Sequence, residues 1–210
     1  MNNIEKLSIG LMIAALFVIG FNEFQIVGLK GNGGQITAQA IVESKPAESK
    51  LPDINILPKG VPEIYGMELG VSYDDISPKD QKKADATISR LGTLDQQITL
   101  KGDDLKRYIA AAGQMSCEYC CGVDSIIFSD GRAACGCQHS FAMRGLAKYL
   151  IKNHGKEYTN DQMLEELGKW KTLFFPSQMA EKAMILKGKG IELNYINIAS
   201  NKYRGAENGN

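Results

Sequence analysis

The stretch Ser116–His139, SCEYCCGVDSIIFSDGRAACGCQH, contains all five cysteines of the chain and one of its two histidines. The cysteines are Cys117, Cys120, Cys121, Cys135 and Cys137, and the histidine is His139. The rest of the 210 residues carry no thiol, so this cluster indicates a metal or redox centre around which the chain is organised. An odd number of cysteines cannot be fully paired into disulfides within one chain, which favours metal ligation, or a catalytic pair with spare thiols, over a disulfide-stapled secreted scaffold.

The spacing of the cysteines predicts how they meet. Cys117-x-x-Cys120 and Cys135-x-Cys137 lie at the two ends of the stretch, while Ser125–Phe128 favours β structure and Ser129–Gly131 favours a turn. A β-hairpin here would fold the two cysteine pairs together, as in a tetrahedral thiolate site. We therefore predict Cys117, Cys120, Cys135 and Cys137 as metal ligands, with Cys121 and His139 as auxiliary ligands.

Zinc is the predicted metal, because four thiolates in tetrahedral geometry suit it, with an iron–sulfur cluster or copper as alternatives. A helix is predicted to begin just after His139, and its partial positive charge favours a thiolate. That effect assists a metal ligand and a redox nucleophile equally. A thiol–disulfide oxidoreductase that uses Cys117 and Cys120, with Cys135 and Cys137 as a resolving pair, therefore remains an open alternative. A disulfide-stapled loop is another.

Other classes of function have little support. The chain carries 24 basic and 24 acidic residues with no basic run, so we expect no nucleic-acid partner. It shows no Ser/His/Asp arrangement, no phosphate-binding glycine loop and no convergent pair of carboxylates. Whether the protein is an enzyme, and whether it has a protein partner, is left open.

The N-terminal region is predicted to be a membrane anchor. Leu7–Phe21, LSIGLMIAALFVIGF, has no charge, and the apolar character resumes over residues 24–29. Residues 1–30 therefore reach the length of a single membrane-spanning helix if Asn22 and Glu23 lie near the interface; a cleaved signal peptide is the alternative. We expect the lipid bilayer as a partner and the soluble domain on the extracytoplasmic side.

The remainder is predicted to be a flexible linker over residues 31–62, a domain over 63–205 and a frayed tail over 206–210. Apolar periodicity and capping residues predict helices over residues 78–91, 104–112, 141–153, 160–171 and 177–186. In these predictions Ser77 and Ser140 cap helices and Gly92 ends one, while Thr159 and Gln162 form a capping box. Short strands are predicted over residues 97–100 and 191–198. The predicted fold class is α+β, mainly α, with a cysteine-bearing β-hairpin.

The motifs CEYCCG (117–122), CGCQHS (135–140) and MRGLAKYL (143–150) resemble a group of uncharacterised membrane-anchored proteins found mainly in archaea. The segment FNEFQI (21–26) is similar to their anchors. This resemblance implies membrane attachment but no specific function. The Cys135–His139 segment is similar to exported proteins with a PCYCGC motif. Cys117-x-x-Cys120 is similar to the thiol reductases of cytochrome c maturation, which would imply redox exchange at the membrane surface.

Overall fold

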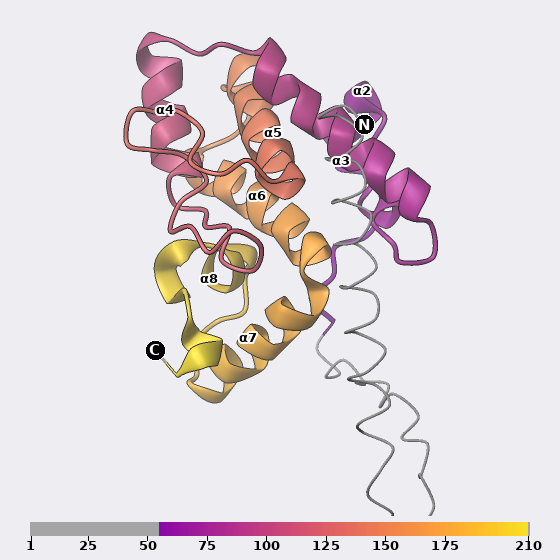
Figure 1. The fold of residues 1–210 in the computed structure, drawn as a ribbon, viewed down its shortest axis with the longest axis vertical. Helices are drawn as coiled ribbons and strands as arrows, with labels where there is room; N and C mark the ends of the chain where they lie inside the picture. Colours follow the sequence, from indigo (N-terminus) through magenta and orange to yellow (C-terminus); the bar gives the residue numbers. More distant parts are fainter. Residues whose placement is uncertain (1–54, 210) are drawn as a thin grey trace, which may run out of the picture. The chain divides into compact units, whose positions relative to one another are not determined.

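The computed structural model describes residues 55–209, which are built mainly from helices (Figure 1). In chain order these are α2 (Gly66–Leu69), η1 (Tyr73–Asp75), α3 (Gln81–Gln97), α4 (Gly102–Ala112), α5 (Gln138–His154), α6 (Asn160–Phe174), α7 (Pro176–Gly188), α8 (Tyr195–Ala199), η2 (Asn201–Tyr203) and η3 (Ala206–Asn208). Within residues 55–209 there is no regular strand, only isolated bridges such as Ile127–Ala133. The mainly helical prediction is confirmed; the β-hairpin and the strands over 97–100 and 191–198 are not formed.

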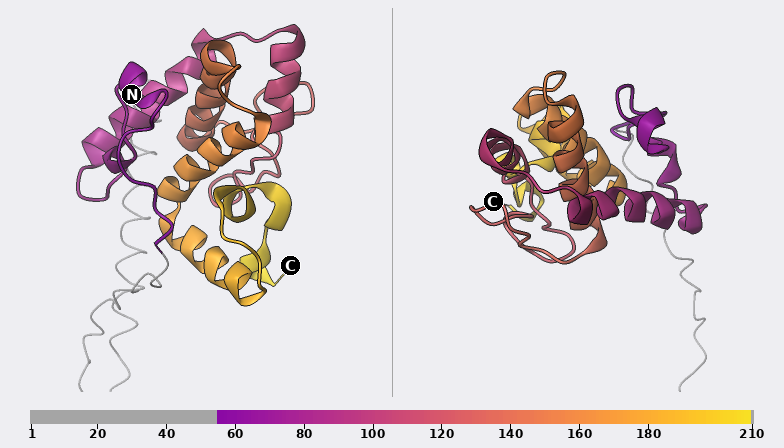
Figure 2. Two further views of the ribbon diagram at one scale, coloured as in Figure 1. Left: turned by 180° about the vertical axis from the view of Figure 1, so that it is seen from behind. Right: turned by 90° about the horizontal axis from the view of Figure 1, so that it is seen from above.

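Helix α3 continues past Gly92, where we predicted it to end, because this glycine packs against α5. A Cβ atom added to Gly145 would lie 2.0 Å from the carbonyl oxygen of Leu91, and one on Gly92 would lie 3.3 Å from the Cβ of Phe141. The two glycines thus let the helices approach closely, as seen from above in Figure 2. Gly92 is a packing residue and does not end the helix, so the prediction of a stop there was wrong.

Two of the predicted helix starts also differ from the structure. Asp80, not Ser77, caps α3, with its side chain accepting a hydrogen bond from the Lys83 amide. Cys137, not Ser140, caps α5: its Sγ accepts a hydrogen bond from the Ser140 amide at 3.4 Å. A sulfur cap is uncommon, and the hydroxyl of Ser140 was the stronger sequence signal.

The capping box at the start of α6 is confirmed. The Gln162 amide donates to Thr159 Oγ1 at 3.2 Å, and the Thr159 amide donates to Gln162 Oε1 at 2.8 Å. Here the sequence signal is purely local, because both partners lie within one turn of the same helix.

The C-terminal segment is packed and helical. Residues 195–199 form α8, whose Ile198 and Ala199 are buried. The tail predicted to fray forms η3 instead: Ala206 is buried, and Glu207 accepts a hydrogen bond from the Tyr119 hydroxyl at 2.9 Å. The strand predicted over residues 191–198 and the frayed tail predicted over 206–210 are both replaced by packed helical turns, because the contacts that fix these residues are made with partners distant in sequence.

The buried apolar side chains form two clusters. The larger one lies among α3, α4, α5 and α6 and includes Trp170. The smaller one joins α7 and α8 to Ile56, which falls inside the segment predicted to be a linker. The larger cluster also contains Cys117 and Cys135, so the cysteine stretch is part of the core.

The predicted anchor, residues 1–30, and the linker as far as residue 54 lie outside the described residues. Among the helices of residues 55–209, none combines the length and apolar character that a membrane span requires.

Replacing Gly145 with alanine tests the α3–α5 crossing. Its Cβ would overlap the Leu91 carbonyl, so we expect the free energy of unfolding to fall by about 3 kcal/mol, measured by urea denaturation. Gly188→Ala is the matched control, because nothing lies within 4 Å of its added Cβ, and we expect no loss of stability. Equal stability of the two variants would contradict this packing.

Candidate metal centre

The first part of the cysteine stretch is a tight turn built on Cys117. The carbonyl oxygen of Cys117 accepts hydrogen bonds from the amides of Cys121 at 3.1 Å and Gly122 at 2.9 Å. The Cys117 amide donates to the Val123 carbonyl at 3.2 Å. Gly122 has a φ of 70°, a conformation that side-chain-bearing residues rarely adopt. This turn brings Cys120 and Cys121 back beside Cys117.

The second part reverses the chain without forming strands. The amide of Ala134 donates to the Ile126 carbonyl at 3.1 Å, and that of Phe128 donates to the Arg132 carbonyl at 2.8 Å. Gly131, with a φ of 84°, provides the predicted turn. The chain reversal expected from a hairpin therefore occurs, but with too few paired residues to make regular β structure.

The two turns bring four thiols together. The Sγ atoms of Cys117, Cys120, Cys121 and Cys137 all lie within 4.8 Å of one another. The Cys117 and Cys137 sulfurs are 3.3 Å apart, and those of Cys120 and Cys121 are 3.9 Å apart. Tetrahedral coordination with metal–sulfur bonds of about 2.3 Å requires sulfur–sulfur separations of about 3.8 Å. The four sulfurs are therefore spaced for a single metal ion.

Two of the six predicted ligands do not join this group. Cys135 is buried in the larger apolar cluster, and its thiol contacts that of Cys121 beside the four-sulfur group. Its place is taken by Cys121, which we had predicted as an auxiliary ligand. Both Cys120 and Cys121 lie on the tight turn at Gly122, and this turn decides which thiols meet.

His139 packs beside the sulfur group rather than within it. Its ring lies 4.9 Å, centroid to centroid, from each of the Phe174 and Phe175 rings. Its Nδ1 is buried and has no hydrogen-bond partner within the described part of the chain. The His139 side chain lies close enough to Cys137 to help lower the pKa of that thiol, after the larger effect of Cys117. His139 therefore lies beside Cys137 and outside the four-sulfur group.

The clustered thiols do not ionise independently. The hydrogen bond between Cys117 and Cys137 raises the pKa of Cys117, with burial adding to the effect, and lowers the pKa of Cys137. The contact with Cys135 raises the pKa of Cys121 to about 12, and desolvation raises that of Cys120. Four neighbouring thiolates repel one another unless a cation lies among them.

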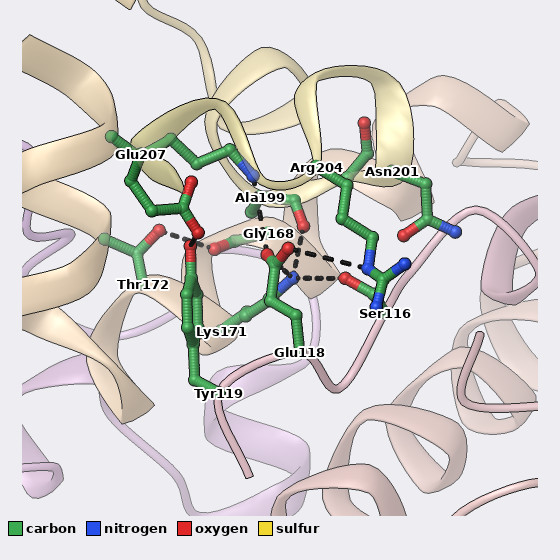
Figure 3. A network of polar contacts seen from close by, with 12 residues as sticks. Ser116, Glu118, Tyr119, Gly168, Lys171, Thr172, Ala199, Asn201, Arg204 and Glu207 are labelled. Atoms are coloured by element: carbon green, nitrogen blue, oxygen red, sulfur yellow. Dashed lines mark hydrogen bonds and ion pairs between the residues drawn. The ribbon is translucent and has the colours of Figure 1, made fainter. Parts of the chain in front are cut away.

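Two buried cations attach this loop to the helices. The Lys171 ammonium on α6 donates to Ser116 Oγ at 2.9 Å, Glu118 Oε1 at 2.9 Å and the Ala199 carbonyl at 2.8 Å (Figure 3). It therefore binds the residues on both sides of Cys117. The Arg144 guanidinium on α5 performs the same task at the other end of the loop.

Arg144 is completely buried and bridges the loop to α3. Its Nη1 donates to the Cys135 carbonyl at 2.7 Å, and its Nε donates to Asp95 Oδ2 at 2.8 Å. The position of the loop relative to α3 and α5 is therefore set by two buried contacts of Arg144: its ion pair with Asp95 and its side-chain hydrogen bond to the Cys135 carbonyl.

We did not single out these charged residues from the sequence, because lysine and arginine side chains are mostly exposed in proteins. A signal existed: Lys171 follows Leu164 and Leu167 at the spacing of one helical face, and those leucines are buried. Lys182 lies on the same face of α7 as Met179 and Leu186, both also buried. A cation on an otherwise apolar helix face indicates a buried ionic contact.

Searches with the chain gave no match to a protein-family model, to a curated protein or to a solved structure. The resemblance of residues 117–122, 135–140 and 143–150 to membrane-anchored archaeal proteins therefore stays a prediction. The indication of function comes from the four sulfur atoms and their surroundings.

Proposed function

We propose that this protein binds one metal ion through Cys117, Cys120, Cys121 and Cys137. The observation that carries the proposal is the mutual proximity of these four sulfurs, which come from the two ends of the loop. Zinc is the metal that best suits four thiolates in tetrahedral geometry; iron, alone or in a cluster, and copper are the alternatives. Four protein ligands leave no open position for a substrate, so the site serves metal handling or structure rather than catalysis.

The difference in burial among the ligands favours metal handling. Cys117 is buried, whereas Cys120 and Cys121 are exposed. An incoming thiolate can therefore reach the ion from the exposed side and displace these ligands one at a time. The buried side keeps the ion attached to the loop during such an exchange.

Substituting Cys121 and Cys135 one at a time distinguishes two possible ligand sets. One is the four sulfurs that meet in the structure, and the other is the four that the sequence spacing predicts. We expect Cys121→Ser to lose the cobalt(II)–thiolate absorption of the anaerobic protein or to weaken cobalt affinity at least about tenfold. Cys135→Ala, which places an apolar side chain in an apolar site, should keep the absorption. The measurement is an anaerobic cobalt titration followed by absorbance, with bound zinc determined by elemental analysis.

The reverse pattern, with cobalt binding lost in Cys135→Ala and kept in Cys121→Ser, would contradict this ligand set. It would instead support the four ligands that the sequence spacing predicts.

A thiol–disulfide oxidoreductase is the second candidate, favoured by the 3.3 Å separation of the Cys117 and Cys137 sulfurs. These two thiols would form a disulfide while a partner disulfide takes up the two electrons and two protons and becomes two thiols. Cys117 is buried, so Cys137 would be the thiol that attacks the partner. The partially positive N-terminus of α5 would stabilise its thiolate.

Thiol titration alongside metal analysis distinguishes the two candidates. A metal centre predicts about one metal ion per chain, with four thiols shielded from alkylation until a chelator removes the ion. A redox pair predicts a metal-free protein that gains a Cys117–Cys137 disulfide on oxidation, detected by peptide mass mapping. The second result would refute metal binding as the function.

We further propose that residues 1–30 anchor the protein in a lipid bilayer with the cysteine domain on the extracytoplasmic side. Support comes from the uncharged segment Leu7–Phe21 and from the resemblance of residues 21–26 to archaeal membrane anchors. An exposed metal ligand pair on a tethered domain suits exchange of an ion with another protein near the membrane.

Cell fractionation tests the anchor. The full chain should remain in the membrane pellet after alkaline extraction, whereas the variant lacking residues 1–30 should be released, because it lacks the apolar segment. Added protease should degrade the domain in intact cells if it lies outside. Release of the full chain by alkaline extraction, or protection of the domain from protease, would contradict the corresponding half of the proposal.

A further inference from the structure

A cluster of buried charges lies directly against the cysteine turn. The side chains of Lys171 and Lys182 are fully buried, and the Glu118 carboxylate between them is nearly so. Both ammonium groups contact the same oxygen, Oε1, at 2.9 Å from Lys171 and 3.4 Å from Lys182. Buried lysines are rare unless paired, and here two share one carboxylate oxygen.

A third cation approaches the same carboxylate. Arg204 Nε lies 3.8 Å from the other Glu118 oxygen, Oε2, which is buried and accepts no hydrogen bond within residues 55–209. Arg204 also pairs with Asp124, whose side chain is 85% exposed, so that pair is largely in water. Glu207 is partly exposed, although its Oε2 is buried; its Oε1 accepts a hydrogen bond from Tyr119, and it is paired with neither lysine in the described structure (Figure 3). The fully buried part of the network therefore has more positive than negative charge.

The excess positive charge is placed next to a metal ligand. Ser116 and Glu118 flank Cys117 in the chain, and Lys171 hydrogen-bonds to both of their side chains. The Lys171 charge and a negative charge on Cys117 are close enough to attract each other. A negatively charged thiolate centre would therefore supply the counter-charge that Glu118 alone does not.

We propose that Lys171 and Lys182 form a buried counter-charge that tunes the cysteine site for a divalent cation. A divalent ion bound by four thiolates leaves the centre with a net charge of about −2, which the neighbouring ammonium groups stabilise across the low-dielectric core. This inference rests on the proposed metal-binding function, and it identifies the two residues that adjust the affinity of the site for the metal ion. Both lysines act through charge without touching the ion, so they are positioning residues.

Lys182 is the better residue for a test, because its ammonium makes a single 3.4 Å hydrogen bond. Lys171, in contrast, holds three elements together through Ser116, Glu118 and Ala199, and its loss would also disturb the fold. Lys182→Met keeps most of the side-chain volume and removes only the charge. Lys187→Met on the exposed face of α7 is the matched control.

Anaerobic cobalt(II) titration of the full chain measures the effect. One unit charge about 10 Å from a centre of charge about −2 changes affinity about tenfold at an effective dielectric constant of about 50, a value suited to a half-exposed site. We therefore expect Lys182→Met to bind cobalt about tenfold more weakly than wild type, with Lys187→Met unchanged. The metal-free Lys182→Met protein should be at least as stable to urea as wild type, because a buried ammonium with incomplete pairing has been removed.

Glu118→Gln provides an independent test of opposite sign. The amide oxygen still accepts a hydrogen bond from Lys171, but the negative charge beside Cys117 is lost, so cobalt should bind about tenfold more tightly. A merely structural role for the network predicts weaker binding in both variants. If Lys182→Met does not fold, Glu118→Gln decides alone.

The outcomes distinguish the two proposals. Wild-type protein that binds no cobalt refutes the metal-binding function itself. Wild-type binding with unchanged affinity in both variants, or with weaker binding in Glu118→Gln, refutes the counter-charge while leaving metal binding intact.

Discussion

Two buried cations, Arg144 and Lys171, hold a loop that has little regular structure of its own. The loop between α4 and α5 cannot be positioned by strand pairing, because its extended pairing is limited to isolated bridges. Arg144 binds the Cys135 carbonyl and Asp95, and Lys171 binds the residues on both sides of Cys117. Removing one partner of such a buried ionic contact leaves an uncompensated charge in the core, which is why these contacts constrain the loop so strongly.

The attachment produces a site with a buried side and an exposed side. Cys117 belongs to the apolar core, whereas Cys120 and Cys121 project from a tight turn at the surface. The proposed metal site is therefore shielded from solvent on one side only. The same arrangement places the charge of Lys171 beside Cys117, so the groups that hold the loop also influence the electrostatic environment of the sulfurs.

Local signals predicted the helices well and their ends less well. The Thr159–Gln162 capping box was read correctly because its partners lie in one turn. Gly92 was misread as a helix end, since its actual role is to admit α5, a contact that no short window of sequence contains. For the same reason residues 191–198 were predicted as a strand, whereas residues 195–199 form α8: the apolar pattern fits either structure, and burial against distant residues decides it.

The sequence alone determined that the chain has one cysteine-rich centre, that helices surround it, and that the chain reverses at Gly131 so that the cysteine pairs return toward each other. Those features follow from composition, periodicity and turn residues. Only the tertiary structure decided which thiols meet, placing Cys121 in the four-sulfur group and Cys135 beside it. That choice depends on backbone hydrogen bonds at Gly122 and on Arg144 holding the Cys135 carbonyl. The second of these contacts is made by Arg144, which lies outside the cysteine stretch, so the spacing of the cysteines could not predict it.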